Sequence, residues 1–119
     1  MRSSGSERRA SPVTEVVLVL TTVPSNDGER IARTLVDERL AACVNILPAM
    51  LSVYRWQGAV EQAEERQLVA KTAIDRVETL TKRLIALHPY DLPEILVLPA
   101  TGGSDRYLTW VNAETRADL

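Results

Sequence analysis

Phenylalanine is absent from this sequence of 119 residues, and cysteine and histidine occur only once each. A single cysteine cannot form an internal disulfide, so we expect a protein of the reducing cytoplasm in which Cys43 is a free thiol or a ligand. The aromatic residues are limited to two tryptophans and three tyrosines. Aliphatic side chains must therefore supply the core, and the position of each aromatic residue becomes informative.

Basic residues are not in excess, because 14 Lys and Arg residues stand against 16 Asp and Glu residues. A net charge of −2 offers no surplus of cations to displace phosphate counterions, which argues against a nucleic-acid partner. No apolar run approaches the roughly 18 residues that a membrane-spanning helix needs, so no membrane partner is expected. With 45% hydrophobic and 25% charged residues, the chain is typical of one soluble globular domain.

The beginning of the chain differs in composition from the rest. The segment "MRSSGSERRASP" is rich in serine and arginine, which is typical of an unstructured terminus. We expect residues 1–14 to form a mobile tail and residues 15–116 to form the single domain.

Hydrophobic periodicity predicts a strand and then a helix in the first third of the domain. The run at 16–22 is β-branched and nearly all apolar, which suits a central strand covered on both faces. Asn26 and Glu29 have the spacing of a capping box. Apolar residues then recur at helical spacing, and the helix is expected to end near Ala41 and Ala42.

The middle of the chain predicts a long β-hairpin. Residues 50–56 alternate in the manner of a strand, "QGA" at 57–59 is a turn signal, and residues 60–72 form a second strand. Pro48 marks a bend or an edge before the hairpin. The acidic run "EQAEER" on this hairpin is interpreted as a solvated face. The outer half of the hairpin exposes edge groups that either need protection or pair with a neighbouring chain.

The last third predicts a helix, a strand and a final short helix. Asp75 and Glu78 repeat the capping-box spacing, and Pro89 should end that helix at about His88. Residues 95–98 form a short apolar strand, and "TGGSD" supplies a Ser or Asp cap for the last helix. The order β-α-β-β-α-β predicts an α+β, ferredoxin-like sandwich with both main helices on one face of an antiparallel sheet, followed by a short C-terminal helix.

Several separated blocks resemble the CutA family of divalent-cation tolerance proteins. The blocks are "ERLAACVNILPAMLSVYRWQGAVE", "LVAKT", "HPYDLPEILVLPA" and "YLTWVNAET", and the similarity runs from about residue 16 to residue 115. The resemblance implies a PII-like homotrimer in which the long hairpins pair with neighbouring sheets. It also implies a cytoplasmic, non-enzymatic protein linked to tolerance of divalent metals, especially copper.

The resemblance also implies a set of site residues around a cleft between subunits. The implied ligand-binding residues are Trp56, Lys71, Tyr90, Glu94, Tyr107 and Trp110. His88 and Cys43 are the implied metal ligands, for copper or zinc bound weakly and not as an essential cofactor. The copper-binding members carry further cysteines where this chain has Thr21 and Arg83, so a soft multi-thiolate Cu(I) site lacks two of its ligands.

The residues themselves leave each of these roles open. His88 suits a metal ligand or a proton donor, and equally a histidine that interacts with the end of its helix. Cys43 suits a ligand or a small buried hydrophobe. Lys71 suits a pair with Glu94 or another carboxylate, or a bound anion. Trp56 suits a ligand wall or an interface between subunits.

Three classes of function compete. The first is a trimeric protein that binds metal ions or a small ligand, and the second is a PII-like small-molecule sensor without a metal role. The third is an acylphosphatase-like hydrolase, for which "TTVPSNDGER" offers Arg30 but no glycine-rich phosphate cradle. RNA recognition on a ferredoxin-like sheet is set aside, because "VVLVLTT" and "EILVLPA" contain no aromatic residues for base stacking.

Overall fold

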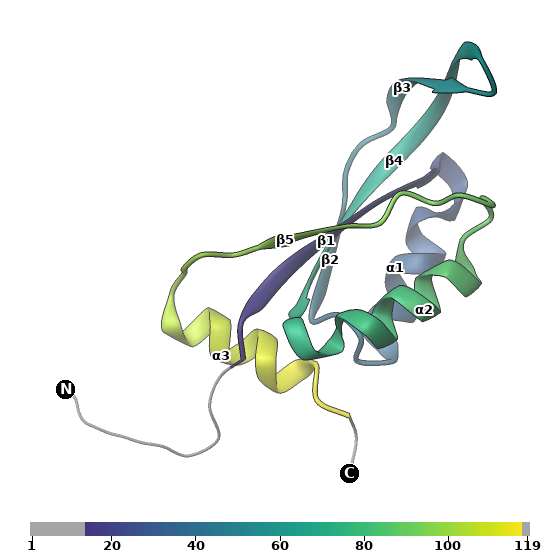
Figure 1. Ribbon diagram of the computed structural model, residues 1–119. Helices are drawn as coiled ribbons and strands as arrows, with labels where there is room; N and C mark the ends of the chain where they lie inside the picture. Colours follow the sequence, from purple (N-terminus) through teal and green to yellow (C-terminus); the bar gives the residue numbers. More distant parts are fainter. Residues whose placement is uncertain (1–13, 118–119) are drawn as a thin grey trace, which may run out of the picture.

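The computed structural model describes residues 14–117, which form an antiparallel sheet with helices packed against it (Figure 1). Residues 1–13 of the predicted tail lie outside the described residues. In chain order the elements are β1 (Val16–Pro24), the 3-10 turn η1 (Ser25–Asp27), α1 (Gly28–Asp37), β2 (Cys43–Ile46), β3 (Met50–Trp56), β4 (Ala59–Ala73), the 3-10 turn η2 (Ile74–Arg76), α2 (Val77–Leu87), β5 (Leu96–Pro99) and α3 (Asp105–Glu114).

The strand order is β2-β4-β1-β5, and β3 pairs with β4 beyond the end of β2. All pairings are antiparallel, so the predicted ferredoxin-like α+β plan is confirmed. The predicted hairpin is also confirmed, and its turn residues Gln57 and Gly58 have φ values of 50° and 83°. Two successive left-handed residues are the signature of the type I′ turn, whose twist matches that of the flanking strands. The hairpin projects beyond the rest of the sheet, because residues 59–64 of β4 pair with β3 but not with β1 (Figure 1).

The core lies between one face of the sheet and helices α1 and α2. Strand β1 alternates along its length, and its residues Val17, Val19 and Val23 are no more than 1% exposed. Their partners from β4 and the two helices are equally buried, and all are aliphatic, as the absence of phenylalanine predicts. These partners are Leu68, Ile31, Leu35, Leu80 and Leu84.

Both predicted capping boxes are wrong. The 3-10 turns η1 and η2 follow strands β1 and β4, and they move the helix starts past the expected caps. The N-cap of α1 is Asp27 and that of α2 is Arg76, and neither side chain makes a capping hydrogen bond within the described chain. The predicted cap of the last helix is confirmed, because the Ser104 hydroxyl accepts a hydrogen bond from the Tyr107 backbone amide at 3.3 Å.

The first helix ends at Asp37, four residues before the expected end, whereas the second ends at Leu87 as predicted. Arg39 adopts a left-handed conformation with φ of 60°, and the Leu40 amide donates to the Leu35 carbonyl at 2.9 Å. This closure stops the helix. Leu40 and Ala41 follow the end of the helix and are buried in the core. Their hydrophobicity therefore continued the helical pattern in the sequence although the helix had ended.

Candidate functional site

The sheet face opposite the helices carries two of the predicted site residues. Because directly paired residues point to the same face, Lys71 of β4 lies between Leu18 of β1 and Cys43 of β2 on this open face. The Lys71 ammonium donates a hydrogen bond to the Asn45 side-chain oxygen and lies 4.0 Å from the Cys43 sulfur. Lys71 is thus held by a neighbouring amide.

Pairing with Glu94 was one of the alternatives left open for Lys71, and this pair does not form within residues 14–117. The Glu94 carboxylate accepts a hydrogen bond from the Gln67 amide at 3.2 Å instead. Gln67 is the fourth residue before Lys71 on the same strand and face. Glu94 therefore contacts β4 four residues before Lys71, and this distance along the strand separates the two charged groups.

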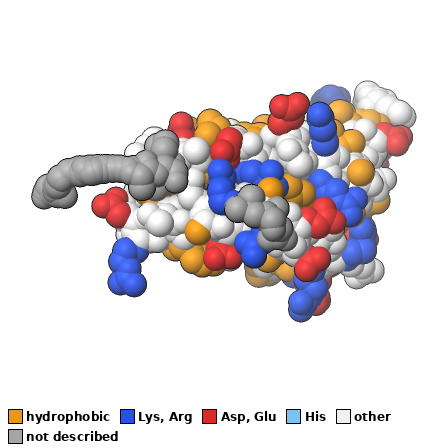
Figure 2. All heavy atoms as spheres, turned by 90° about the horizontal axis from the view of Figure 1, so that it is seen from below, with side chains coloured by type: hydrophobic (Ala, Val, Ile, Leu, Met, Phe, Trp, Pro, Cys, Tyr) orange, Lys and Arg blue, Asp and Glu red, His pale blue; other side chains and the backbone are white. Residues whose placement is uncertain are grey.

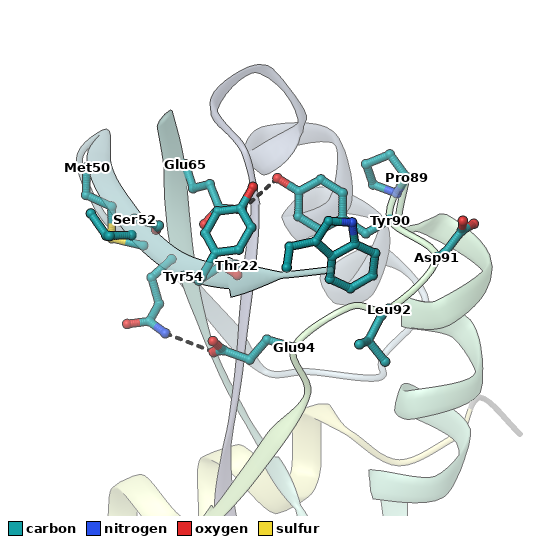
Figure 3. A pocket seen from close by; sticks show the side chains of 13 residues that line it. Thr22, Met50, Ser52, Tyr54, Glu65, Pro89, Tyr90, Asp91, Leu92 and Glu94 are labelled. Atoms are coloured by element: carbon teal, nitrogen blue, oxygen red, sulfur yellow. Dashed lines mark hydrogen bonds between the residues drawn. The ribbon is translucent and has the colours of Figure 1, made fainter. Parts of the chain in front are cut away.

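A pocket of about 820 Å³ lies at the hairpin end of the open face. Its walls come from β3, from the middle of β4 and from the corner between α2 and β5 (Figure 3). Three of the predicted ligand-binding residues line this pocket, namely Trp56, Tyr90 and Glu94. Tyr54 and Glu65 line it as well.

Glu65 and Tyr90 form the central contact of this pocket. The Tyr90 hydroxyl donates a hydrogen bond of 2.6 Å to the Glu65 carboxylate, drawn as a dashed line in Figure 3. That length is typical of a bond to an ionised acceptor. Burial raises the pKa of Tyr90, and the hydrogen bond to Glu65 and its negative charge raise that pKa further. The phenol therefore remains a proton donor at neutral pH.

His88 is buried at the end of α2 and fastens the corner to the sheet. Its Nε2 lies 2.8 Å from the Thr22 carbonyl of β1, and its Nδ1 accepts a hydrogen bond from the Tyr90 amide at 3.2 Å. An Nε2–H tautomer satisfies both bonds. His88 thus contacts a carbonyl of β1, and a metal ion at either ring nitrogen would have to displace one of these partners.

The remaining predicted residues lie elsewhere in the subunit. Tyr107 and Trp110 stack on α3 with ring centroids 5.5 Å apart, and both are close to half exposed. Neither lines the pocket. Cys43 is half-buried on β2. Within residues 14–117, no three His, Cys, Asp or Glu side chains gather closely enough to hold a metal ion.

Glu65 is the functional candidate that sequence reasoning missed. The acidic run that contains it was interpreted as a solvated face, yet only 6% of Glu65 is exposed, whereas Glu61 and Glu64 are exposed as expected. Strand alternation on β4 separates Glu65 from Glu64 but not from the exposed Glu61, so no local signal identifies Glu65. Glu65 shares the open face with Gln67 and Lys71, while Glu64 points to the other side.

The two positions where copper-binding members carry cysteines lie outside the pocket here. Thr21 is 2% exposed in the core beneath the helices. Arg83 lies on α2 and makes a bidentate ion pair with Glu38, with N–O distances of 2.8 and 2.9 Å. This hydrogen-bonded pair lowers the pKa of Glu38 and raises that of Arg83.

A ferredoxin-like sandwich with a long hairpin and a pocket at the base of that hairpin defines a protein of PII-like architecture. Residues 17–114 match the family described as CutA1 divalent ion tolerance protein. The chain belongs to this CutA1 family.

Individual relatives agree with that assignment. The divalent-cation tolerance protein CutA of Thermus thermophilus is 50% identical over 99 residues, covering 82% of this chain and 96% of the relative. The chloroplastic protein CutA of Arabidopsis thaliana is 44% identical over 115 residues, which cover 96% of this chain and only 63% of that longer protein. The solved PII-like protein CutA of Nostoc superposes with a TM-score of 0.81 at 38% identity, covering 86% of this chain and 99% of its own.

Proposed function

We propose that this chain forms a homotrimer in the cytoplasm, catalyses no reaction, and contributes to tolerance of divalent metal ions, copper among them. The observation that carries the assembly is the exposed apolar edge of the sheet. In β5, Leu96 is 54% exposed, and Val97 and Leu98 are exposed as well. Leu51 and Val53 of β3 are each 64% exposed.

Strand edges and apolar side chains coincide at these places. Within the described residues, β5 pairs only with β1 and β3 pairs only with β4, so each strand has one unpaired edge. An exposed apolar edge strand is a template for pairing with another chain. Pairing the hairpin of one copy with β5 of the next satisfies both edges. Repeating that heterologous contact around an axis closes a ring.

The assembly is tested by measuring mass in solution. Light scattering at micromolar concentration is expected to give about three times the chain mass of 13.2 kDa. Leu96→Lys should shift the mass toward that of a monomer, because it places a charge on the proposed interface. Ile85→Lys on α2 is the matched control, since Ile85 is also 54% exposed but lies on a helix, and this variant should keep the wild-type mass. A monomeric wild-type protein would overturn the proposal.

The proposed metal ligands are His88 and Cys43, with copper or zinc bound weakly and not essential to the fold. Weak binding is expected because His88 must give up its contact with Thr22 or with the Tyr90 amide before it can ligate. Calorimetry with Cu(II) and Zn(II) should show a larger loss of affinity in His88→Ala than in Cys43→Ser. Binding that is unchanged in His88→Ala would reject this site.

A PII-like small-molecule binding role without a metal is the second candidate, and the pocket at the hairpin favours it. An apolar and aromatic cleft with a few placed polar groups is the usual form of a small-molecule site. Tyr107, Trp110 and Lys71 lie outside this pocket in one subunit. We propose that assembly completes the cleft with Tyr107 and Trp110 from a neighbouring copy, whereas Lys71 stays on the open face of its own subunit beside Asn45. The hydrolase alternative gains no support, because Arg30 is engaged by Asp27 at 3.0 Å.

No helix within residues 14–117 has the length and apolar character needed to cross a membrane.

A further inference from the structure

We infer that the pocket at the hairpin end takes an organic cation, of the class of linear polyamines. This inference rests on the proposed ligand-binding role and deepens it by naming the chemistry of the ligand. Three carboxylates and three aromatic rings line this one cavity, and no cationic side chain is among the described residues that line it.

The carboxylates of this pocket lack positive partners. Glu65 is held by the neutral Tyr90 hydroxyl, and Glu94 is held by the neutral Gln67 amide. Within residues 14–117, no ion pair involves either of them or Asp91, which also lines the pocket. A glutamate that is only 6% exposed normally has a cation beside its carboxylate, because an unpaired buried charge is costly. A cationic ligand would supply the positive partner that these carboxylates lack.

The aromatic walls select an organic cation. Tyr54 and Trp56 are 43% and 44% exposed, so their rings are open to a ligand, and Tyr90 lines the same cavity. Aromatic faces attract ammonium groups through the ring quadrupole, and they offer apolar contact to the methylene chain between two such groups. Figure 3 labels Tyr54, Glu65 and Tyr90 among the side chains that line the pocket.

A bare metal ion or an anion fits this pocket less well. The carboxylates do not converge on a single point, since the described residues contain no group of three acidic, His or Cys side chains with metal-binding geometry. A polyamine carries its positive charges on separate ammonium groups, so it does not require the carboxylates to converge. Anionic ligands such as nucleotides meet negative charge and no cationic partner among the described lining residues.

Calorimetry with spermidine, in buffer near physiological salt, tests the proposal on the intact protein. We expect one spermidine per chain. Glu94→Gln should weaken binding roughly ten-fold or more, because it removes a charged hydrogen-bond acceptor. Trp56→Ala should weaken it roughly three- to thirty-fold through loss of the cation–π contact. Glu64→Gln is the matched control, since it removes the same charge from the exposed side of β4 and should leave the affinity within about two-fold.

Three results would overturn the inference. They are no heat of spermidine binding to the wild type, an equal loss in Glu64→Gln and Glu94→Gln, and full displacement of spermidine by Mg²⁺ at equal ionic strength. Light scattering on the same samples separates this failure from failure of the proposed assembly. A trimer that binds Cu(II) but not spermidine rejects the polyamine alone, whereas a monomer rejects the assembly.

Discussion

The helix-covered face of the sheet and its open face are formed by alternate residues of the same strands, yet their side chains differ in kind and in burial. On the covered face Val17 and Val19 of β1 are each 1% exposed, beneath aliphatic residues of α1 and α2. On the open face Leu98 of β5 is 40% exposed, and β4, which is separated from β5 by β1, presents Glu65, Gln67 and Lys71. One face is closed within the subunit, and the other is open.

The two faces of this small domain contribute differently to stability and to function. The covered face removes apolar area from water at about 25 cal/mol per Å², so it supplies the stability of the subunit. The open face retains charged and aromatic groups that contribute little to the fold of one copy. Those groups remain available for association and for ligand binding.

The largest expected loss of folding stability comes from a substitution that creates a cavity on the covered side of the sheet. Leu80 of α2 is fully buried, so Leu80→Ala should lower the free energy of unfolding by about 2–5 kcal/mol. Ile85→Ala, on the same helix but 54% exposed, should change it by less than about 1 kcal/mol. Urea denaturation monitored by circular dichroism measures both. Equal losses in the two variants would remove the distinction between the covered and exposed sides.

Two threonines sharpen the comparison within the covered face. The Thr72 hydroxyl donates to the Leu40 carbonyl at 2.8 Å, whereas the buried Thr21 hydroxyl has no hydrogen-bond partner among the described residues. Thr72→Val should therefore cost about 1 kcal/mol, while Thr21→Val should stabilise the protein by up to about 1 kcal/mol. Thermal and urea unfolding of the matched pair test the opposite signs. A loss of stability in Thr21→Val would show that the Thr21 hydroxyl has a hydrogen-bond partner.

The smallest expected change in stability concerns exposed ion pairs. Acidic and basic side chains are interspersed on the end of the molecule near α3 (Figure 2). Arg116 makes a bidentate pair with Asp75 at 2.7 and 2.8 Å, and this hydrogen bonding holds the pKa of Asp75 below its ordinary value of 3.8. Both side chains are more than 40% exposed, so Asp75→Asn should cost at most about 1 kcal/mol at neutral pH.

The sign of the pH dependence follows from that lowered pKa. The contribution of Asp75 is complete above 3.8 and is lost as the pH falls through the lowered folded-state value. The difference between wild type and Asp75→Asn should therefore shrink below pH 3.8 in urea titrations. Glu78→Gln, which breaks an exposed pair with Lys82 at 3.3 Å, serves as the control and should show a smaller difference at every pH.

Much of the element order was predictable because it depends on local chemistry. The hairpin turn at Gln57 and Gly58, the stop before Pro89 and the Ser104 cap each act within a few residues, and all three are confirmed. The cap at Asn26 failed because a strand that ends in a 3-10 turn moves the helix start. The spacing of Asn26 and Glu29 by itself does not reveal that a 3-10 turn lies between the strand and the helix.

The sequence by itself determined the α+β class, the alternation of the strands and the family, because periodicity and motif spacing are local properties of the chain. Only the tertiary structure decided that Glu65 is buried beside Tyr90, that Lys71 contacts Asn45, and that Glu94 contacts Gln67. The physical reason is that side-chain partners on a sheet depend on register across strands. In this protein the register joins residues from distant parts of the chain, and no local pattern specifies it.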